Sequence, residues 1–542
     1  MTAAVTVPRQ RAPLAGYGIL LRLAVHRDRI IVPASIVVLV AMVPITGGSV
    51  ASLYGTQAQR DALLASAGAN DAFRLLLGPF EHAQSVASAV SWRIGLFMVV
   101  ALGVVAALAV VRHTRKEEEL GRLELVRAGR VGALAPLAVG ITAGAVVSAA
   151  TGILMAVAIG IQAGADLASS VAFGVQFAAT GFAATGLAGV TAQVATSART
   201  ANTLAAGAIV AGYALRGAAD VDDGLRWLVW ASPVGWAQRI DPFGANAVLP
   251  ALACVLAGIV AAGLAVRLQL SRDIDSGLIR PRPGPPTSTT LTGPFAVLLR
   301  TTRASIASWT ITVGAYCLLV GFLLSSVDDI AGDSDQMRQL VETLGGSSAL
   351  SDSFQAIVAS FVGLAAAAWT VTLAVKLHAD ENAGRTEAIL ATRVSRARLF
   401  GAATVLMLLG VTAIAVVSGL AMGVAHAISA GDWGDAVRDG VVAGAVQIPA
   451  AAVVGAVALT IYAWRPRAVV TGWAVIVAIL VVSQFGELLS LPQWLRDISP
   501  FSHVPMVPVD DVDALPLVTL AVVAAVLVAS GFAGFRRRDV PV

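Results

Sequence analysis

Two short charged segments carry the residue types that could do chemistry in this otherwise apolar chain. The first, 117–131, reads EEELGRLELVRAGRV, and the second, 380–394, reads DENAGRTEAILATRV. They share a Glu-x-x-Gly-Arg-x-Glu pattern at a constant spacing: Glu118, Gly121, Arg122 and Glu124 in the first copy, and Glu381, Gly384, Arg385 and Glu387 in the second. Glutamate and arginine four residues apart form ion pairs on a helix. We predict that both segments are helical and bind a soluble partner protein.

A plain solvated loop is the alternative explanation for these segments. Loops on the cytoplasmic side of a membrane protein are enriched in lysine and arginine. That rule does not explain glutamates and a glycine that stay in register in both copies, so we favour the docking function.

Motifs for catalysis are absent from the sequence. Neither lysine, Lys116 or Lys376, is followed by Ser or Thr, so neither belongs to a Gly-Lys-Ser/Thr loop that binds ATP phosphates. The six histidines are scattered without metal-ligand spacing, and no serine or cysteine has a recognisable nucleophile setting. We predict no catalytic residue, no metal site and no bound cofactor. Without a long basic stretch that includes aromatics, we also expect no nucleic-acid partner.

Long apolar stretches must position the charged segments. Of 542 residues, 57% are hydrophobic and 13% are charged, compared with about 25% charged in soluble domains. A helix of roughly 20 apolar residues spans a bilayer, and no alternating strand pattern is present. We therefore predict an all-α polytopic membrane protein with about twelve transmembrane helices. The expected spans are roughly 30–47, 92–112, 133–161, 169–193, 202–217, 245–267, 304–326, 354–376, 399–427, 438–461, 468–486 and 516–535.

Several markers repeat in the same order and indicate an internal duplication into two six-helix halves. The halves are 1–267 and 293–542, joined by a Pro-rich linker at 268–292. An interfacial helix is expected at 14–29, with a similar lead-in at 291–300. The charged helices are expected at about 113–130 and 377–394. Because an even number of spans keeps both halves in the same orientation, and because basic residues gather in the same loops, we predict that the charged helices, the linker and both termini are cytoplasmic.

This combination resembles the permeases of ABC exporters. It is most similar to the fused, double-length actinobacterial branch linked to antibiotic and multidrug efflux, including tetronasin-type exporters. The resemblance rests on six spans per half, an interfacial lead-in, the Glu-x-x-Gly-Arg-x-Glu helix between the second and third spans, and a proline-containing tract before the last span. It covers nearly the whole chain.

The resemblance implies a function and a set of partners. In that family the charged helix is a coupling helix that sits in a cleft of an ATPase subunit, so the glutamates, glycines and arginines above become contact candidates. Two separate ATPase subunits would use ATP and Mg and would drive translocation of a lipophilic compound across the bacterial plasma membrane. Because the second copy differs at Asn382 and Thr386, the two contacts are expected to be unequal.

Two other classes of function are alternatives for an apolar chain of this kind. A secondary transporter driven by an ion gradient commonly needs acidic or basic residues inside the membrane, and the middles of the expected spans hold essentially none. An enzyme acting on lipids, or a structural subunit, has no supporting residue pattern.

Apolar spans favour a hydrophobic or amphipathic substrate. Candidates for a central cavity are Phe97, Met98, Phe361 and Trp369, although packing against helices or lipid is the commoner role of such side chains. Two matching tracts near the last spans contain Trp227 and Pro233, and Trp494 and Pro500. They are candidates for an outer gate or for the aromatic belt at the membrane surface.

Overall fold

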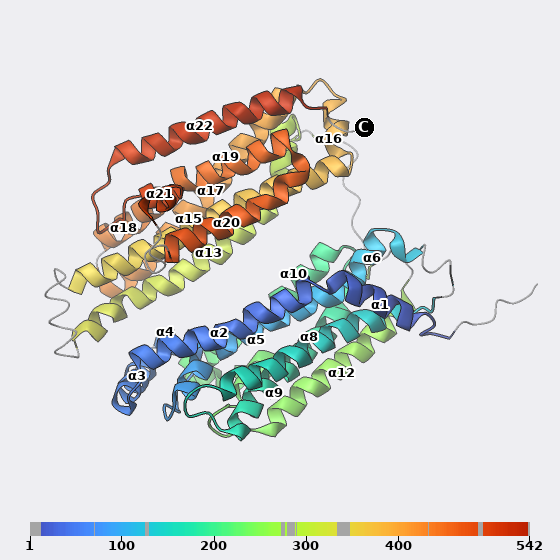
Figure 1. The fold of residues 1–542 in the computed structure, drawn as a ribbon, viewed down its shortest axis with the longest axis vertical. Coiled ribbons are helices and arrows are strands. Elements are labelled where there is room, and N and C mark those ends of the chain that lie inside the picture. The colour runs from blue at the N-terminus through green and yellow to red at the C-terminus, as the bar shows by residue number, and fades with distance from the viewer. Residues whose placement is uncertain are drawn as a thin grey trace, which may run out of the picture. The chain divides into compact units, whose positions relative to one another are not determined.

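The computed structural model confirms the all-α fold class. It describes residues 12–69, 71–124, 129, 131–272, 277–278, 288, 290–332, 347–431, 433–485 and 492–539, and within these residues every regular element is a helix (Figure 1). Eleven of the described helices are long and apolar enough to cross a membrane. The chain is therefore a multi-pass membrane protein.

Two compact units, Met1–Gly284 and Pro285–Val542, make up the chain. The division falls inside the expected linker at 268–292, most of which lies outside the described residues. In unit 1 the helices are α1 (Tyr17–Asp28), α2 (Ile31–Leu53), α3 (Gln57–Ala69), α4 (Asp71–Leu77), α5 (Val86–His113), α6 (Arg115–Glu119), α8 (Ala135–Gly160), α9 (Leu167–Val194), α10 (Ala198–Val221), η1 (Asp223–Ala231), α11 (Pro233–Gln238) and α12 (Val248–Ser271).

Unit 2 contains a corresponding series. Its helices are α13 (Pro294–Gly332), α15 (Ser347–Asn382), α16 (Arg385–Leu390), α17 (Arg396–Ala430), α18 (Trp433–Ala445), α19 (Ile448–Trp464), η2 (Pro466–Thr471), α20 (Gly472–Phe485), α21 (Gln493–Arg496), η3 (Pro500–His503) and α22 (Ala514–Arg537). Pro449, at the second position of α19, lacks the N–H that would continue the backbone hydrogen bonds of α18 into α19.

The same helix pairs pack in each unit. In unit 1, α9 lies against α5, α8 and α12; in unit 2, α19 lies against α15 and α22, while α18 lies against α17. Glycines permit the closest approaches. A Cβ at Gly152 would lie 2.6 Å from the Gly174 carbonyl oxygen, and a Cβ at Gly419 would lie 2.3 Å from the Gly440 carbonyl oxygen. Small residues at such crossings let helices approach closely in lipid, where dispersion contacts replace the hydrophobic effect.

Two details differ from the sequence prediction. The span expected at 468–486 corresponds to η2 and α20, whose apolar part, Pro466–Leu480, is shorter than a full candidate span, so the described residues contain eleven long candidates where about twelve were predicted. The lead-in at 14–29 forms the separate helix α1 in unit 1, whereas its counterpart in unit 2 is continuous with the first span in α13.

A buried arginine fixes the end of unit 1 that lies opposite α6. The Arg216 side chain has no exposed surface and forms a 3.0 Å ion pair with Asp220. Its guanidinium donates to the carbonyls of Leu75 and Leu76 at 3.0 and 2.9 Å, at the C-terminus of α4. The last carbonyls of a helix have no partner within it, so this arginine satisfies groups that would otherwise be buried and unpaired.

We expect Arg216→Leu to lower the free energy of unfolding by about 3–5 kcal/mol, because it leaves Asp220 and the α4 carbonyls buried without a cation. Denaturant-dependent unfolding of the purified chain in detergent measures this loss. Arg226→Leu is the matched control: its ion pair with Asp223 is 66% and 78% exposed, and such pairs contribute about 0–1 kcal/mol. Equal effects of the two substitutions would contradict the structural role of Arg216.

Candidate functional site

Each charged segment forms a sharp bend, here called an elbow, between two long helices. Elbow 1 is residues 113–124 and elbow 2 is residues 376–390. The chain turns at Gly121 and Gly384, whose φ angles are +67° and +71°. Their N–H groups donate to the carbonyls of Glu118 and Glu381, both at 2.9 Å. Residues with a Cβ rarely adopt this left-handed conformation, which explains the glycine in both copies.

A carboxylate is buried at elbow 1. The Glu118 side chain is 3% exposed and lies 2.8 Å from the Arg115 guanidinium. Arg272 donates to both carboxylate oxygens, at 2.7 and 2.8 Å, and to the amide oxygen of Gln193 at 2.7 Å. A two-pronged arginine–carboxylate contact is among the strongest charge-assisted hydrogen bonds in proteins. Glu118 therefore connects the elbow to the C-terminal end of α12, where Arg272 is the capping residue.

Elbow 2 contains the same arrangement with a single arginine. The Glu381 side chain is 2% exposed and accepts a 2.7 Å hydrogen bond from Arg538. Arg538 caps α22, the last helix of unit 2, and its guanidinium lies 5.3 and 5.4 Å from the Tyr462 and Phe535 ring centroids. The residue in the place of Arg115 is His378, whose Nε2 lies 3.1 Å from Asn382. We call the Glu118–Arg272 and Glu381–Arg538 contacts clasps.

The clasps were not predicted from the sequence. The signal that could have identified them is positional: a basic residue occurs directly after each last span, and a glutamate precedes each elbow glycine. Since cations are favoured near a helix C-terminus, both arginines also suit the ends of α12 and α22.

A second ion pair bridges each glycine turn. Arg122 lies 3.5 Å from Glu117, and Arg385 lies 2.6 Å from Asp380. These two pairs stand in place of the intrahelical pairs that were expected, Glu118–Arg122 and Glu381–Arg385, because the glycine turn ends the helix before the arginine. These arginines are 52% and 62% exposed, so the pairs contribute little to stability.

Further contacts attach elbow 1 to neighbouring helices. Glu117 forms a 2.9 Å ion pair with Arg27 of α1, and its hydrogen bond raises the pKa of Arg27 above the usual value. Glu119 accepts a 3.0 Å hydrogen bond from the Ala198 N–H, at the N-terminus of α10, where the helix dipole favours a negative charge. In unit 2, Asn382 stands in the place of Glu119. Helix η2 of that unit begins with Pro466, which has no N–H to donate.

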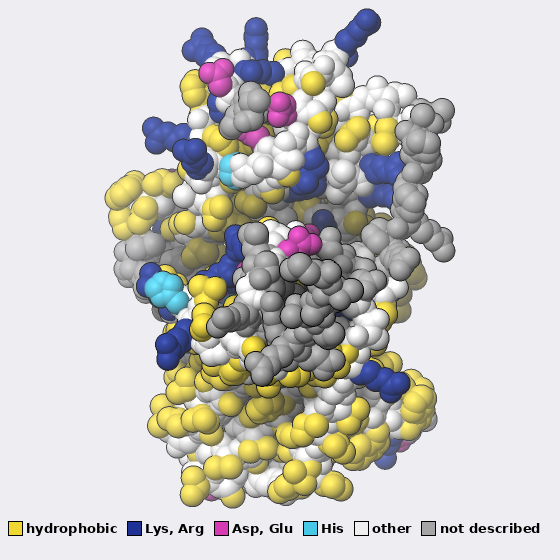
Figure 2. Space-filling view, turned by 90° about the vertical axis from the view of Figure 1, so that its right-hand side faces the viewer, with side chains coloured by type: hydrophobic (Ala, Val, Ile, Leu, Met, Phe, Trp, Pro, Cys, Tyr) yellow, Lys and Arg dark blue, Asp and Glu magenta, His cyan; other side chains and the backbone are white. Residues whose placement is uncertain are grey.

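The exposed part of each elbow is smaller than the sequence pattern indicates. Arg122 and Glu124, with Arg385 and Glu387, are exposed, and the face drawn in Figure 2 carries Lys and Arg side chains. Residues 125–128 and 130 of the expected helix at 113–130 lie outside the described residues. Glu118 and Glu381 were predicted to contact a partner directly, and burial in the clasps removes them from the surface.

The cavity and gate candidates have different surroundings. Trp369 was a candidate to line a cavity, but its side chain is fully buried among helices of unit 2, so it lines no open space in this conformation. Phe97 and Phe361 are about 40% exposed, and Met98 packs against the core of unit 1. Trp227 and Trp494 are exposed, while Pro233 and Pro500 each begin a short helix. No cluster of metal-ligating residues occurs among the described residues.

Comparison with known proteins identifies relatives of the whole chain. Residues 291–536 match the family described as multidrug efflux system permease Rv1217c, C-terminal domain. The chain is 34% identical over 537 residues to the multidrug efflux system permease protein Rv1217c of Mycobacterium tuberculosis. That alignment covers 98% of this chain and 97% of the relative.

The glycine turn gives a first prediction for the elbows. Gly384→Ala should destabilise unit 2 by about 1–2 kcal/mol, because alanine is strained at φ +71° although nothing lies within 4 Å of the added Cβ. Gly207→Ala is the control, since Gly207 is helical and equally open; there alanine should stabilise by roughly 0.5–1 kcal/mol. Unfolding of the two variants in detergent measures both signs, and a stabilising Gly384→Ala would refute the turn geometry.

A double-mutant cycle tests the clasp. Glu381→Gln or Arg538→Gln alone should cost about 3–5 kcal/mol, because each leaves the opposite charge buried without its partner. The double variant should cost much less than the sum, since the two groups interact directly. The control cycle is the neighbouring pair of partly buried Asp380 and exposed Arg385, whose coupling should be at most about 1 kcal/mol. Additive effects at Glu381 and Arg538 would contradict the clasp.

Proposed function

The chain belongs to the family of the multidrug efflux system permease Rv1217c, and from this premise we propose that it is the membrane-spanning permease of an ABC exporter. It extrudes hydrophobic or amphipathic compounds, antibiotics and drugs among them, and separate ATPase subunits supply the energy. One observation carries this proposal: both units have an elbow that is exposed on one side and clasped to the unit's last helix on the other.

The exposed side of each elbow suits a protein partner. Arg122 and Glu124 in elbow 1, and Arg385 and Glu387 in elbow 2, present both signs of charge on a rigid bend. Leu120 adds an apolar side chain that is about half exposed. Mixed charge around an apolar contact is typical of protein–protein interfaces, in which arginine is enriched.

The buried side of each elbow suits the transmission of a movement. Elbow 1 continues directly from α5, binds α12 through Arg272 and binds the start of α10 through Glu119. Elbow 2 continues from α15 and binds α22 through Arg538, while Lys376 donates to Thr301 of α13 at 2.8 Å. A partner that displaces an elbow therefore displaces several helices of that unit together. In the proposed cycle, ATP-driven closure of the partners switches the units between inward- and outward-facing states.

The orientation follows from the charge distribution. Basic residues gather at the elbow ends, including Arg22, Arg27, Arg112 and Arg300, whereas Asp61, Asp222 and Asp223 belong to the opposite end of unit 1. Positively charged loops remain in the cytoplasm. We therefore propose that the elbows and both termini face the cytoplasm of the bacterial cell, where the ATPase subunits bind ATP and Mg.

The two elbows support a stoichiometry of two ATPase copies per chain, which is part of the proposal. Their surroundings are unequal, because elbow 1 is held by two arginines and elbow 2 by one. We propose that elbow 2, with fewer charged contacts, transmits less of the partner's movement. The exposed Phe97 and Phe361 stay candidates for contact with a lipophilic substrate.

Co-purification tests the proposal. Reversing the exposed charges together, Arg122→Glu with Arg385→Glu, should reduce the ATPase recovered with the chain by about tenfold or more, since each arginine is expected to contribute about 1–2 kcal/mol to the interface. Native mass spectrometry of the detergent-purified complex measures the copies retained. The control is Arg226→Glu with Arg438→Glu, two exposed arginines, one in each unit, at the ends opposite the elbows.

Two results would remove the proposal. One is equal ATPase recovery from the elbow variant and the control. The other is a chain that purifies alone and moves substrate in vesicles when only an ion gradient is imposed, which would support the secondary transporter instead.

A further inference from the structure

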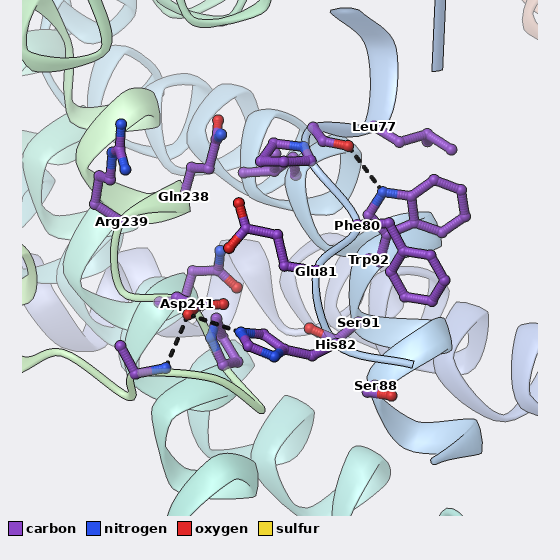
Figure 3. Close-up of a pocket in the computed structure, with 16 residues that line it drawn as sticks. Leu77, Phe80, Glu81, His82, Ser88, Ser91, Trp92, Gln238, Arg239 and Asp241 are labelled. Carbon is purple, nitrogen blue, oxygen red and sulfur yellow. Dashed lines mark hydrogen bonds and ion pairs between the residues drawn. The ribbon is translucent and has the colours of Figure 1, made fainter. Parts of the chain in front are cut away.

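Unit 1 contains a polar pocket at the end opposite its elbow (Figure 3). Its walls come from the loop after α4, the start of α5, the middle of α9 and the residues that follow α11. The side chains used below are those of Phe80, Glu81, Trp92, Gln176, Gln238 and Asp241. None of them belongs to the elbows, and the proposed coupling mechanism uses none of them.

Two amide oxygens at this pocket have no hydrogen-bond donor in the part of the chain that the structure describes. Gln176 is 4% exposed, and its Nε2 donates to the Ala237 carbonyl at 3.0 Å. The Nε2 of Gln238 donates to Asp220 at 2.9 Å. Both bonds fix which end of the amide is the donor, so each Oε1 is left as a buried acceptor, and neither has a partner among the described residues. A buried acceptor without a donor is costly, so a ligand that donates hydrogen bonds would satisfy either oxygen.

Charge and aromatic surface at the pocket favour a cation. Figure 3 shows the Glu81 carboxylate between the Gln238 side and the Trp92 side of the pocket. The Trp92 and Phe80 rings are stacked with centroids 4.4 Å apart, and the faces of such rings attract ammonium groups. Asp241 accepts a 2.8 Å hydrogen bond from the Ala245 N–H and lies 3.4 Å from His82 Nε2. Arg239, the other basic residue of the lining, is exposed at the rim.

The size of the pocket limits its occupant. Its volume is about 210 Å³, smaller than the roughly 300–1,000 Å³ of sites that enclose a drug-sized ligand. A small ammonium-bearing group fits this space, and the rest of a larger amphipathic molecule would remain outside it.

We propose that this pocket binds the protonated primary amine of an amphipathic compound. Glu81 neutralises the ammonium, the Oε1 atoms of Gln176 and Gln238 accept its N–H bonds, and Trp92 with Phe80 covers its carbon stem. The ammonium can come from a free cationic compound or from the ethanolamine headgroup of a lipid. Binding at this site does not depend on ATP or on the elbows, so it can be tested apart from the proposed transport function.

Unit 2 supplies an internal comparison. Gln447 is a buried glutamine whose Oε1 likewise lacks a partner among the described residues. A Cβ at Gly363 would lie 2.7 Å from that oxygen and 2.7 Å from the Phe501 ring. The aromatic ring therefore packs where Gln447 and Gly363 meet. Substitution of Gln447 reproduces the loss of a buried amide without changing the pocket of unit 1.

The test is direct binding to the full chain in phosphatidylcholine nanodiscs, whose lipid headgroups have no N–H donors. The probe is dansylcadaverine, a fluorescent compound with a primary ammonium, and its binding is measured by fluorescence anisotropy. Glu81→Gln and Gln176→Leu should each weaken its binding by about tenfold or more, because each removes an interaction with a charged group. Gln447→Leu should leave the affinity unchanged, and N-acetylated probe should not bind above the level of empty nanodiscs.

The outcomes separate the sources and decide the proposal. If phosphatidylethanolamine nanodiscs weaken probe binding to the native chain but not the residual binding to Glu81→Gln, the lipid headgroup occupies the site. If phosphatidylethanolamine nanodiscs do not weaken probe binding to the native chain, a free amine is the ligand. Native affinity in both Glu81→Gln and Gln176→Leu, or equal binding of the acetylated probe, would overturn the proposal. Because Glu81 is exposed, its variant should fold normally, and an unchanged melting temperature checks this.

Discussion

A carboxylate withdrawn from water near the end of a membrane-spanning helix must find a cation, and that requirement organises both elbows. Removing a carboxylate from water costs several kcal/mol unless a well-placed partner compensates. Glu118 and Glu381 obtain their partners from residues that cap α12 and α22, far away in the sequence. This contact joins the helix turn before each elbow glycine to the end of the unit's last helix.

The two units satisfy the requirement in different ways. In unit 1 the buried glutamate has two arginines, and Glu119 adds a contact to α10. In unit 2 a histidine and an asparagine occupy the corresponding positions, and the single arginine is supported by aromatic rings. The chain thus contains a strongly charged clasp in unit 1 and a weakly charged one in unit 2. These differences lie at the positions that hold the elbow.

Much of the fold could be predicted from the sequence because hydropathy and chain length determine which segments cross a membrane. The expected spans at 92–112 and 169–193 correspond to α5 and α9 within a few residues at either end. The span expected at 468–486 corresponds to η2 and α20, which run from Pro466 to Phe485, but apolar composition does not reveal that it starts with a short 3-10 turn at Pro466. The elbow residues could be found because the pattern occurs twice. Their burial could not, because it depends on arginines that only the tertiary fold brings to Glu118 and Glu381.

The sequence separation within each clasp has a consequence for synthesis. Arg272 follows Glu118 by 154 residues and Arg538 follows Glu381 by 157 residues. At roughly 5–20 residues per second, each glutamate leaves the ribosome about 8–30 seconds before its arginine. During that interval the carboxylate has to stay hydrated. Each elbow is therefore among the last parts of its unit to become fixed, and its completion marks the insertion of that unit's final helix.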